Sequence, residues 1–204
     1  MNNVGRTVII ALVLLGTLLW TSSPALADGV TYTETAVASG SLGDASFSDA
    51  LVTITLFGDP STVTTGLFGA LEVFGPATVT VEGIGTASFI DSLAAFDNPI
   101  FGSAGISDPS LGLFGLDVLN TIDPAFVTYD LTTDIGPITG PTVFSPDVAT
   151  FATTDDDFVL TSNSGTSTFS ASTAVPEPSS LFLLGVGLSG LFLARRKKAP
   201  SATA

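Results

Sequence analysis

The feature that most constrains the fold is a long stretch of chain without a positive charge. Residues 28–175 contain no lysine, arginine or histidine, while the chain as a whole has 19 acidic residues. Only Glu177 of these lies beyond the stretch, so its 148 residues carry 18 carboxylates and no basic side chain. No salt bridge can form there, and repulsion between like charges opposes compaction. The stretch must therefore fold by burying apolar surface.

The composition supplies the material for such a core. Hydrophobic residues make up 45% of the chain and charged ones 12%, and about 150 residues is an ordinary size for one domain. Cysteine is absent, so no disulfide contributes. Without a cation, the region cannot neutralise phosphates, which excludes nucleic acid and anionic lipid as its partners.

The pattern of the acidic region predicts β-structure. Apolar and polar residues alternate in Ala50–Phe57, Thr78–Glu82 and Phe126–Leu131, as expected for half-buried strands. Other expected strands are Thr31–Ala38, Val148–Thr153, Phe158–Thr161 and Thr166–Ser172, and only Ile90–Phe96 and Leu111–Leu119 have a helical character. We expect eight to ten short strands in an all-β fold, an antiparallel two-sheet β-sandwich ectodomain.

Two local patterns allow alternative interpretations. A Ser/Thr-rich run at residues 161–168 predicts either a hairpin with its turn at Asn163–Gly165 or a flexible stalk, and the flanking phenylalanines favour the hairpin. Residues 43–49 resemble residues 85–91, each with a phenylalanine followed by an aspartate. This similarity indicates either a duplicated binding loop or two similar strand entries, and a single repeat favours the strand entries.

The N-terminus has the order of a secretory signal peptide. Arg6 lies in a short polar start, Val8–Trp20 is apolar, and Ala25 and Ala27 form an A-x-A site. We expect residues 1–27 to form an N-terminal signal-peptide helix that signal peptidase removes after Ala27. The alternative is an uncleaved N-terminal anchor.

The C-terminal tail has three parts. Residues 171–180 form a linker with a Pro-Glu-Pro motif, residues 181–194 are uncharged, and residues 195–204 form a basic end. A helix over 181–194 would be about 21 Å long, which is short for a bilayer core of about 30 Å, yet we expect a single transmembrane helix there. The positive-inside rule keeps both basic ends cytoplasmic and the ectodomain, residues 28–170, outside. The motif residues are Val175, Pro176, Glu177 and Pro178, and the basic residues are Arg195, Arg196, Lys197 and Lys198.

In its order and spacing this tail resembles the PEP-CTERM sorting signal of Gram-negative bacteria. The resemblance covers roughly the last thirty residues. It implies that an exosortase at the inner membrane reads the motif, and that the protein passes through a membrane-anchored intermediate to the cell surface or the exterior. It also implies an association with exopolysaccharide and biofilm. An ordinary C-terminal anchor is the alternative.

The acidic region offers little for catalysis. It lacks the histidine, cysteine and lysine on which most bases and nucleophiles depend, so we expect no enzyme and no cofactor. The run Asp155, Asp156 and Asp157 is a weak candidate for binding Ca²⁺, but EF-hand spacing is absent, which favours a solvated loop.

Three functions are therefore compatible with the sequence. The first is an exported, exosortase-sorted structural protein of the surface or extracellular matrix. The second is a Ca²⁺-dependent module that binds carbohydrate or another surface. The third, and least favoured, is a glycoside hydrolase that uses carboxylates alone.

Overall fold

The computed structural model describes residues 29–111, 116–142 and 150–173. Asp28–Ala174 form one compact unit, and its described part consists of strands, turns and short 3₁₀ helices. None of the described helices is long and apolar enough to cross a membrane. The predicted signal peptide, sorting motif, transmembrane segment and basic end all lie outside the described residues.

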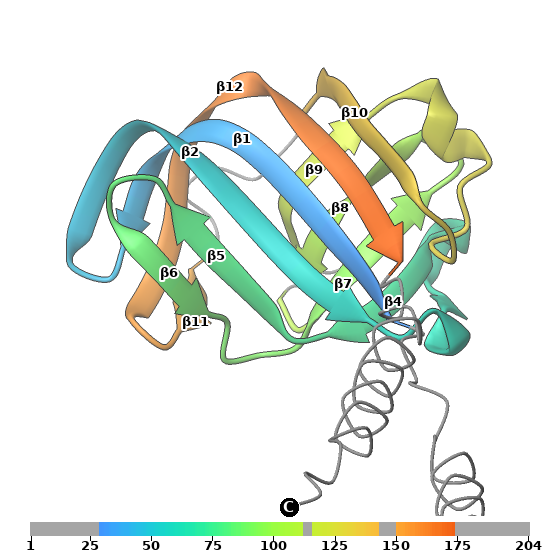
Figure 1. The fold of residues 1–204 in the computed structure, drawn as a ribbon, viewed down its shortest axis with the longest axis horizontal. Helices are drawn as coiled ribbons and strands as arrows, with labels where there is room; N and C mark the ends of the chain where they lie inside the picture. The colour runs from blue at the N-terminus through green and yellow to red at the C-terminus, as the bar shows by residue number, and fades with distance from the viewer. Residues whose placement is uncertain (1–28, 112–115, 143–149, 174–204) are drawn as a thin grey trace, which may run out of the picture. The chain divides into compact units, whose positions relative to one another are not determined.

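Two antiparallel sheets build the domain (Figure 1). The larger has seven strands in the order β10-β12-β1-β2-β5-β6, with β11 paired to β12. These strands are β1 (Val30–Leu42), β2 (Ala45–Gly58), β5 (Ala77–Val81), β6 (Gly85–Ser88), β10 (Ile135–Pro141), β11 (Phe151–Thr153) and β12 (Asp156–Thr173).

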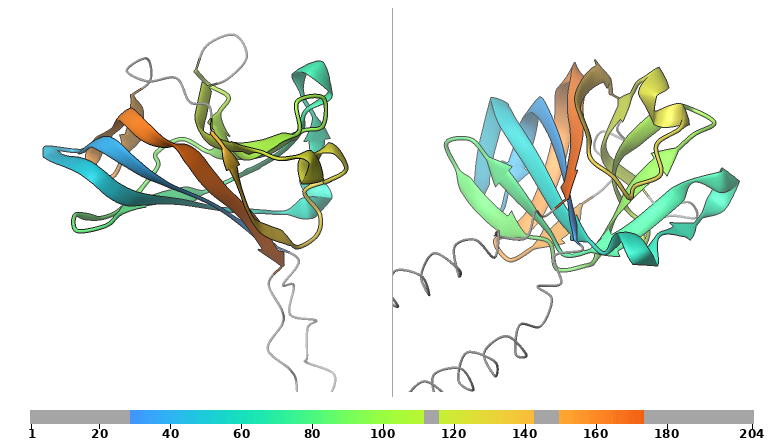
Figure 2. Two further views of the ribbon diagram at one scale, coloured as in Figure 1. Left: turned by 90° about the horizontal axis from the view of Figure 1, so that it is seen from above. Right: turned by 45° about the vertical axis from the view of Figure 1, so that its right-hand side comes forward.

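The smaller sheet has five strands in the order β3-β4-β7-β8-β9. They are β3 (Thr64–Thr65), β4 (Leu71–Gly75), β7 (Leu93–Asn98), β8 (Ser103–Asp108) and β9 (Leu116–Ile122). Three short 3₁₀ helices join strands: η1 (Pro60–Thr62), η2 (Leu67–Gly69) and η3 (Pro124–Val127). The two sheets form separate layers in the views of Figure 2, as predicted for a β-sandwich.

Apolar side chains from both sheets fill the space between the layers. The ring of Phe169 on β12 is fully buried and lies 5.6 Å, centroid to centroid, from Phe126 of η3. Its other ring neighbours are Tyr32, at 6.4 Å, and Tyr129, at 6.2 Å. This aromatic cluster joins the larger sheet to the η3 segment.

Several predicted strands are confirmed, and four local predictions are wrong. The described part of Leu111–Leu119 is not helical, because residues 116–119 begin β9. Ile90–Phe96 is not helical but leads into β7, which is buried on both faces and therefore lacks the alternation of a half-exposed strand. Phe126–Leu131 is not a strand, because Pro124 begins η3 and Asp123 caps it by accepting from the Ala125 N–H. Asn163–Gly165 is not a hairpin turn.

The segment around Gly165 is an irregularity within one long strand. β12 is continuous from Asp156 to Thr173, three residues past the predicted end of the domain. Its register with β1 shifts at this point: Ala36 pairs with Ser167, whereas Ala38 pairs with Asn163. Gly165 has a φ of 79°, so the backbone absorbs the extra residues as a β-bulge.

The similarity between residues 43–49 and 85–91 reflects core packing. Phe47 and Phe89, the equivalent phenylalanines, both contact Phe158, at ring distances of 6.4 and 6.1 Å. Each repeat thus delivers a ring to the same part of the core, which agrees with two similar strand entries.

We predict that Phe169→Ala lowers the free energy of unfolding by about 3–5 kcal/mol, because it leaves a cavity among four packed rings. Phe101→Ala removes the same atoms from a ring that is 68% exposed and should cost well under about 1 kcal/mol. Denaturant unfolding of the full-length protein, followed by the near-ultraviolet circular dichroism of its two tyrosines, measures both. Similar losses in the two variants would show that the cluster is not central to stability.

Candidate functional site

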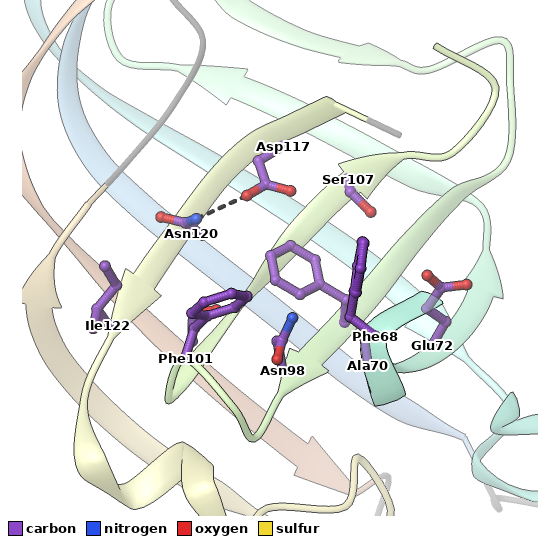
Figure 3. A pocket seen from close by; sticks show the side chains of 11 residues that line it. Phe68, Ala70, Glu72, Asn98, Phe101, Ser107, Asp117, Asn120 and Ile122 are labelled. Atoms are coloured by element: carbon purple, nitrogen blue, oxygen red, sulfur yellow. Dashed lines mark hydrogen bonds between the residues drawn. The ribbon is translucent and has the colours of Figure 1, made fainter. Parts of the chain in front are cut away.

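A pocket of about 430 Å³ lies on the outer face of the smaller sheet, the face turned away from the other layer (Figure 3). Its volume falls in the range of roughly 300–1,000 Å³ that is typical of small-molecule sites. The residues that line it are Phe68, Ala70, Glu72, Phe96, Asn98, Phe101, Ser103, Ser107, Asp117, Asn120 and Ile122.

The strand register explains why these residues share one face. Cross-strand partners point to the same side of a sheet, so Glu72 on β4 lies beside Phe96 on β7. Asn98 in turn pairs with Ser103 on β8. Ser103 also pairs with Ile122 on β9. The floor of the pocket is therefore formed by cross-strand pairs of side chains on β4, β7, β8 and β9.

Two exposed phenylalanines border the pocket. Phe101 lies in the turn between β7 and β8, where its N–H donates to the Asn98 carbonyl oxygen at 3.2 Å. Phe68 comes from η2, and the two side chains are 68% and 66% exposed. Figure 3 shows both rings beside Asn98. Large rings left in water at the edge of a pocket are typical of a binding surface.

The backbone at Phe68 is strained. Phe68 has a φ of 55°, and Gly69 after it has a φ of 77°. The left-handed region is unfavourable for a phenylalanine by about 1–2 kcal/mol, and such strain concentrates at functional sites. A Cβ on nearby Gly66 would lie 2.5 Å from Oε1 of Glu72, so this glycine leaves room for the carboxylate.

A β-bulge places the polar residues of β9. Ser107 pairs with Asp117 and Ile106 pairs with Leu119, so Val118 is the extra residue. The bulge brings Asp117 and Asn120, three residues apart, onto the pocket face. Nδ2 of Asn120 then donates to Oδ2 of Asp117 at 2.8 Å.

Negative charge is the only formal charge in this pocket. Burial raises the pKa of Asp117, and the hydrogen bond from Asn120 partly offsets this effect. Glu72 and Asp117 lie on opposite sides of the pocket in Figure 3. Because β7 and β8 separate β4 from β9, their backbones are three strand spacings, roughly 14 Å, apart.

The opposite face of β9 carries a second polar feature, a chain of hydroxyls between the sheets. Oγ1 of Thr121 lies 2.6 Å from Oε1 of Glu34, a β1 residue with no exposed surface. Thr121 also lies 2.7 Å from Oγ of Ser167 on β12. The Ser167 hydroxyl donates to the Asn120 carbonyl oxygen at 2.6 Å.

Counting protons along this chain fixes the state of Glu34. Ser167 has one proton and gives it to the Asn120 carbonyl, so Thr121 must donate to Ser167. Thr121 then has no proton left for Glu34, and the three contacts are satisfied together only if Glu34 is protonated and donates to Thr121. Consistently, burial raises the pKa of Glu34 to about 8, despite the neighbouring hydroxyls that lower it.

Asp97 is a second fully buried carboxyl group. It lies on the inner face of β7, and neither of its oxygens has a hydrogen-bond partner among the described residues. Burial, followed by the charge of Asp130, raises the pKa of Asp97 to about 7. Both inner acids therefore stay neutral in the folded protein up to a higher pH than an exposed carboxyl group would.

The predicted metal candidates lie away from the pocket. Asp155 lies in the turn between β11 and β12, and Asp156, with a φ of 77°, and Asp157 begin β12; all three are exposed. Within residues 29–111, 116–142 and 150–173, no group of three or more acidic side chains is placed to hold a metal ion. Ca²⁺ binding by this turn stays a prediction.

Sequence reasoning missed the pocket. Glu72 and Asp117 belong to different strands, and no local spacing connects them. The available signal was Asn98-Pro99-Ile100-Phe101, a turn that carries two large apolar residues toward solvent.

Comparisons with known proteins concern the tail. Residues 174–197 match the family model described as the PEP-CTERM protein-sorting motif, which confirms the resemblance found in the sequence. The motif indicates an exported protein that an exosortase sorts after membrane-anchored passage toward the cell surface. Among the curated proteins and the solved structures, none matches the chain.

We predict that stability falls as the pH rises. Glu34 and Asp97 ionise near their ordinary pKa values when unfolded but only near pH 8 and 7 when folded. The two groups contribute fully to the free energy of unfolding below about pH 4. This contribution is lost as the pH rises through the folded pKa, at up to about 1.4 kcal/mol per pH unit for each group. The unfolding free energy of the full-length protein, measured from pH 6 to 8, should therefore decrease.

Glu34→Gln should flatten much of this slope, because an amide can donate to Thr121 at every pH. Glu82→Gln makes the same carboxyl-to-amide change in the exposed turn between β5 and β6 and should keep the wild-type slope. Parallel curves for wild type and Glu34→Gln would contradict a protonated Glu34.

Proposed function

We propose that this protein is an exosortase-sorted surface or matrix protein that binds glycan through the pocket on the outer face of its smaller sheet. The observation that carries the proposal is the pairing of two exposed phenylalanine rings with amide, hydroxyl and carboxylate groups in one cavity. Sugar rings present C–H faces that pack on aromatic rings, and hydroxyls that need polar partners. The sorting motif supports delivery of this domain to the exterior, where exopolysaccharide would be its partner.

The proposed role is binding without chemistry. Carboxylate-only glycoside hydrolysis needs two carboxyl groups held about 5–10 Å apart, whereas Glu72 and Asp117 lie on strands whose backbones are roughly 14 Å apart. The proposal therefore assigns both residues to binding. No cofactor is part of the proposal. Ca²⁺-dependent glycan binding is tested separately, because the candidate metal ligands Asp155–Asp157 do not line the pocket.

We predict selective glycan binding that depends on the pocket rings. On a glycan array, full-length protein in detergent should bind a limited set of glycans. Phe101→Ala should weaken that binding about five- to tenfold, since one ring contact is worth about 1 kcal/mol or somewhat more. Phe57→Ala removes a ring that is 51% exposed on β2 of the other sheet and should leave binding unchanged.

Two further arms complete this test. Binding with and without Ca²⁺ decides whether the metal is required, and chromatography of the bound glycan reports any cleavage. A uniform absence of selective signal would leave a matrix protein without a glycan site, and cleavage products would mean that the domain is an enzyme.

We predict that exported protein lacks both terminal segments. Its mass should correspond to a chain that starts at Asp28 and has lost Leu181–Lys198. Because residues 28–194 contain no lysine or arginine, trypsin leaves this region intact and whole-protein mass spectrometry reads the processing directly. A mass that extends to Ala204 in a strain with an active exosortase would mean that the tail is a permanent anchor.

A further inference from the structure

The charges around the pocket restrict its ligand more than its shape does. Glu72 and Asp117 line the pocket, and the ectodomain that surrounds it has 18 carboxylates and no basic side chain. The field of such a domain repels anions and concentrates cations at its surface. Glycans built from uronic acids or carrying phosphate or sulfate are therefore excluded on electrostatic grounds.

The aromatic rings of the pocket also favour a positively charged ligand. The face of a phenylalanine ring attracts an ammonium group, with about 0.5–1 kcal/mol at exposed sites. Phe68 and Phe101 offer this surface on the same side of the sheet as the two carboxylates. A ligand that carries an amine gains from both kinds of group, whereas a neutral sugar gains only from ring packing and hydrogen bonds.

The ionised form of Asp117 is also costly without such a ligand. Burial already raises the pKa of Asp117, which means that its ionised form is destabilised in the free protein. The amide of Asn120 compensates for part of this cost, but the described residues include no cation that could compensate for the rest. An ammonium group on a ligand would supply such compensation.

We infer that the pocket selects amino-sugar residues with free amines, from a de-N-acetylated glycan, whose ammonium groups pair with Glu72 and Asp117. This inference rests on the proposed function and names the ligand class of the same site. The hydroxyl and amide groups of Asn98, Ser103 and Ser107 favour a sugar over a lysine side chain, which has no hydroxyls for them to bind. The two carboxylates, at opposite sides of the pocket, match a ligand with more than one amine.

The test compares five small ligands by calorimetry with the full-length protein in detergent. They are tetramers of glucosamine, N-acetylglucosamine, glucose and galacturonic acid, together with tetralysine. The amine of an amino sugar is less basic than a lysine amine, because the neighbouring ring and hydroxyl oxygens withdraw electrons. The titrations are therefore run at about pH 5.5, below the pKa of that amine. The glucosamine tetramer should bind at least about tenfold more tightly than each of the others, and its affinity should fall as salt is added.

Charge-neutralising variants separate the pocket from the general field of the domain. Asp117→Asn and Glu72→Gln should each weaken glucosamine binding about tenfold, as expected for the loss of a hydrogen bond to a charged group. Asp44→Asn and Glu82→Gln remove the same charges from exposed turns of the larger sheet and should change the affinity less than about twofold. Equal losses in all four variants would overturn the site, leaving only diffuse attraction.

The remaining outcomes distinguish the two proposals. Equal affinity for the glucosamine and N-acetylglucosamine tetramers would overturn the selection for amines but preserve glycan binding. If tetralysine bound as tightly as the glucosamine tetramer and this binding depended on Asp117, the inference that the ligand is a sugar would be overturned. If none of the four oligosaccharides binds, the proposed function itself fails.

Discussion

The absence of every basic side chain from the acidic domain governs how its carboxylates are accommodated. Ionised aspartates are placed at turns, where backbone N–H groups replace cations as partners. Asp59 accepts from the Ser61 hydroxyl at 2.7 Å and from the Ser61 N–H at 2.9 Å, and Asp130 accepts from the Thr132 N–H at 2.9 Å. These bonds lower the pKa of both carboxyl groups, so the turns are stabilised by the ionised form.

Inside the sandwich the opposite solution applies. Glu34 has no exposed surface and donates its proton into a hydroxyl chain that ends on β9. This chain links β1 and β12 of the larger sheet to β9 of the smaller one. A neutral acid avoids most of the cost of burying a charge, and its hydrogen bonds give the two apolar layers a defined alignment.

Sequence patterns predicted the class of fold because half-buried strands such as β2 and β5 alternate clearly. They failed where both faces of a strand are covered, as in β7, since a continuous apolar run fits a short helix equally well. They failed also at Phe126, where Asp123 and Pro124 start a 3₁₀ helix that overrides an alternating sequence. The pocket was out of reach because it depends on strand order and on the bulge at Val118, neither of which is encoded locally.

The long pairing between β1 and β12 has a consequence for export. The first and last strands of the domain are neighbours in the sheet, from Val30 with Thr173 to Leu42 with Phe158. Contacts this distant in sequence cost more loop-closure entropy than local ones and slow folding. The centre of the larger sheet cannot close until Thr173 has crossed the membrane, two residues before Val175 and the sorting motif. A chain exported from its N-terminus can therefore complete this sheet only after its last strand has emerged, directly ahead of the sorting motif in the sequence.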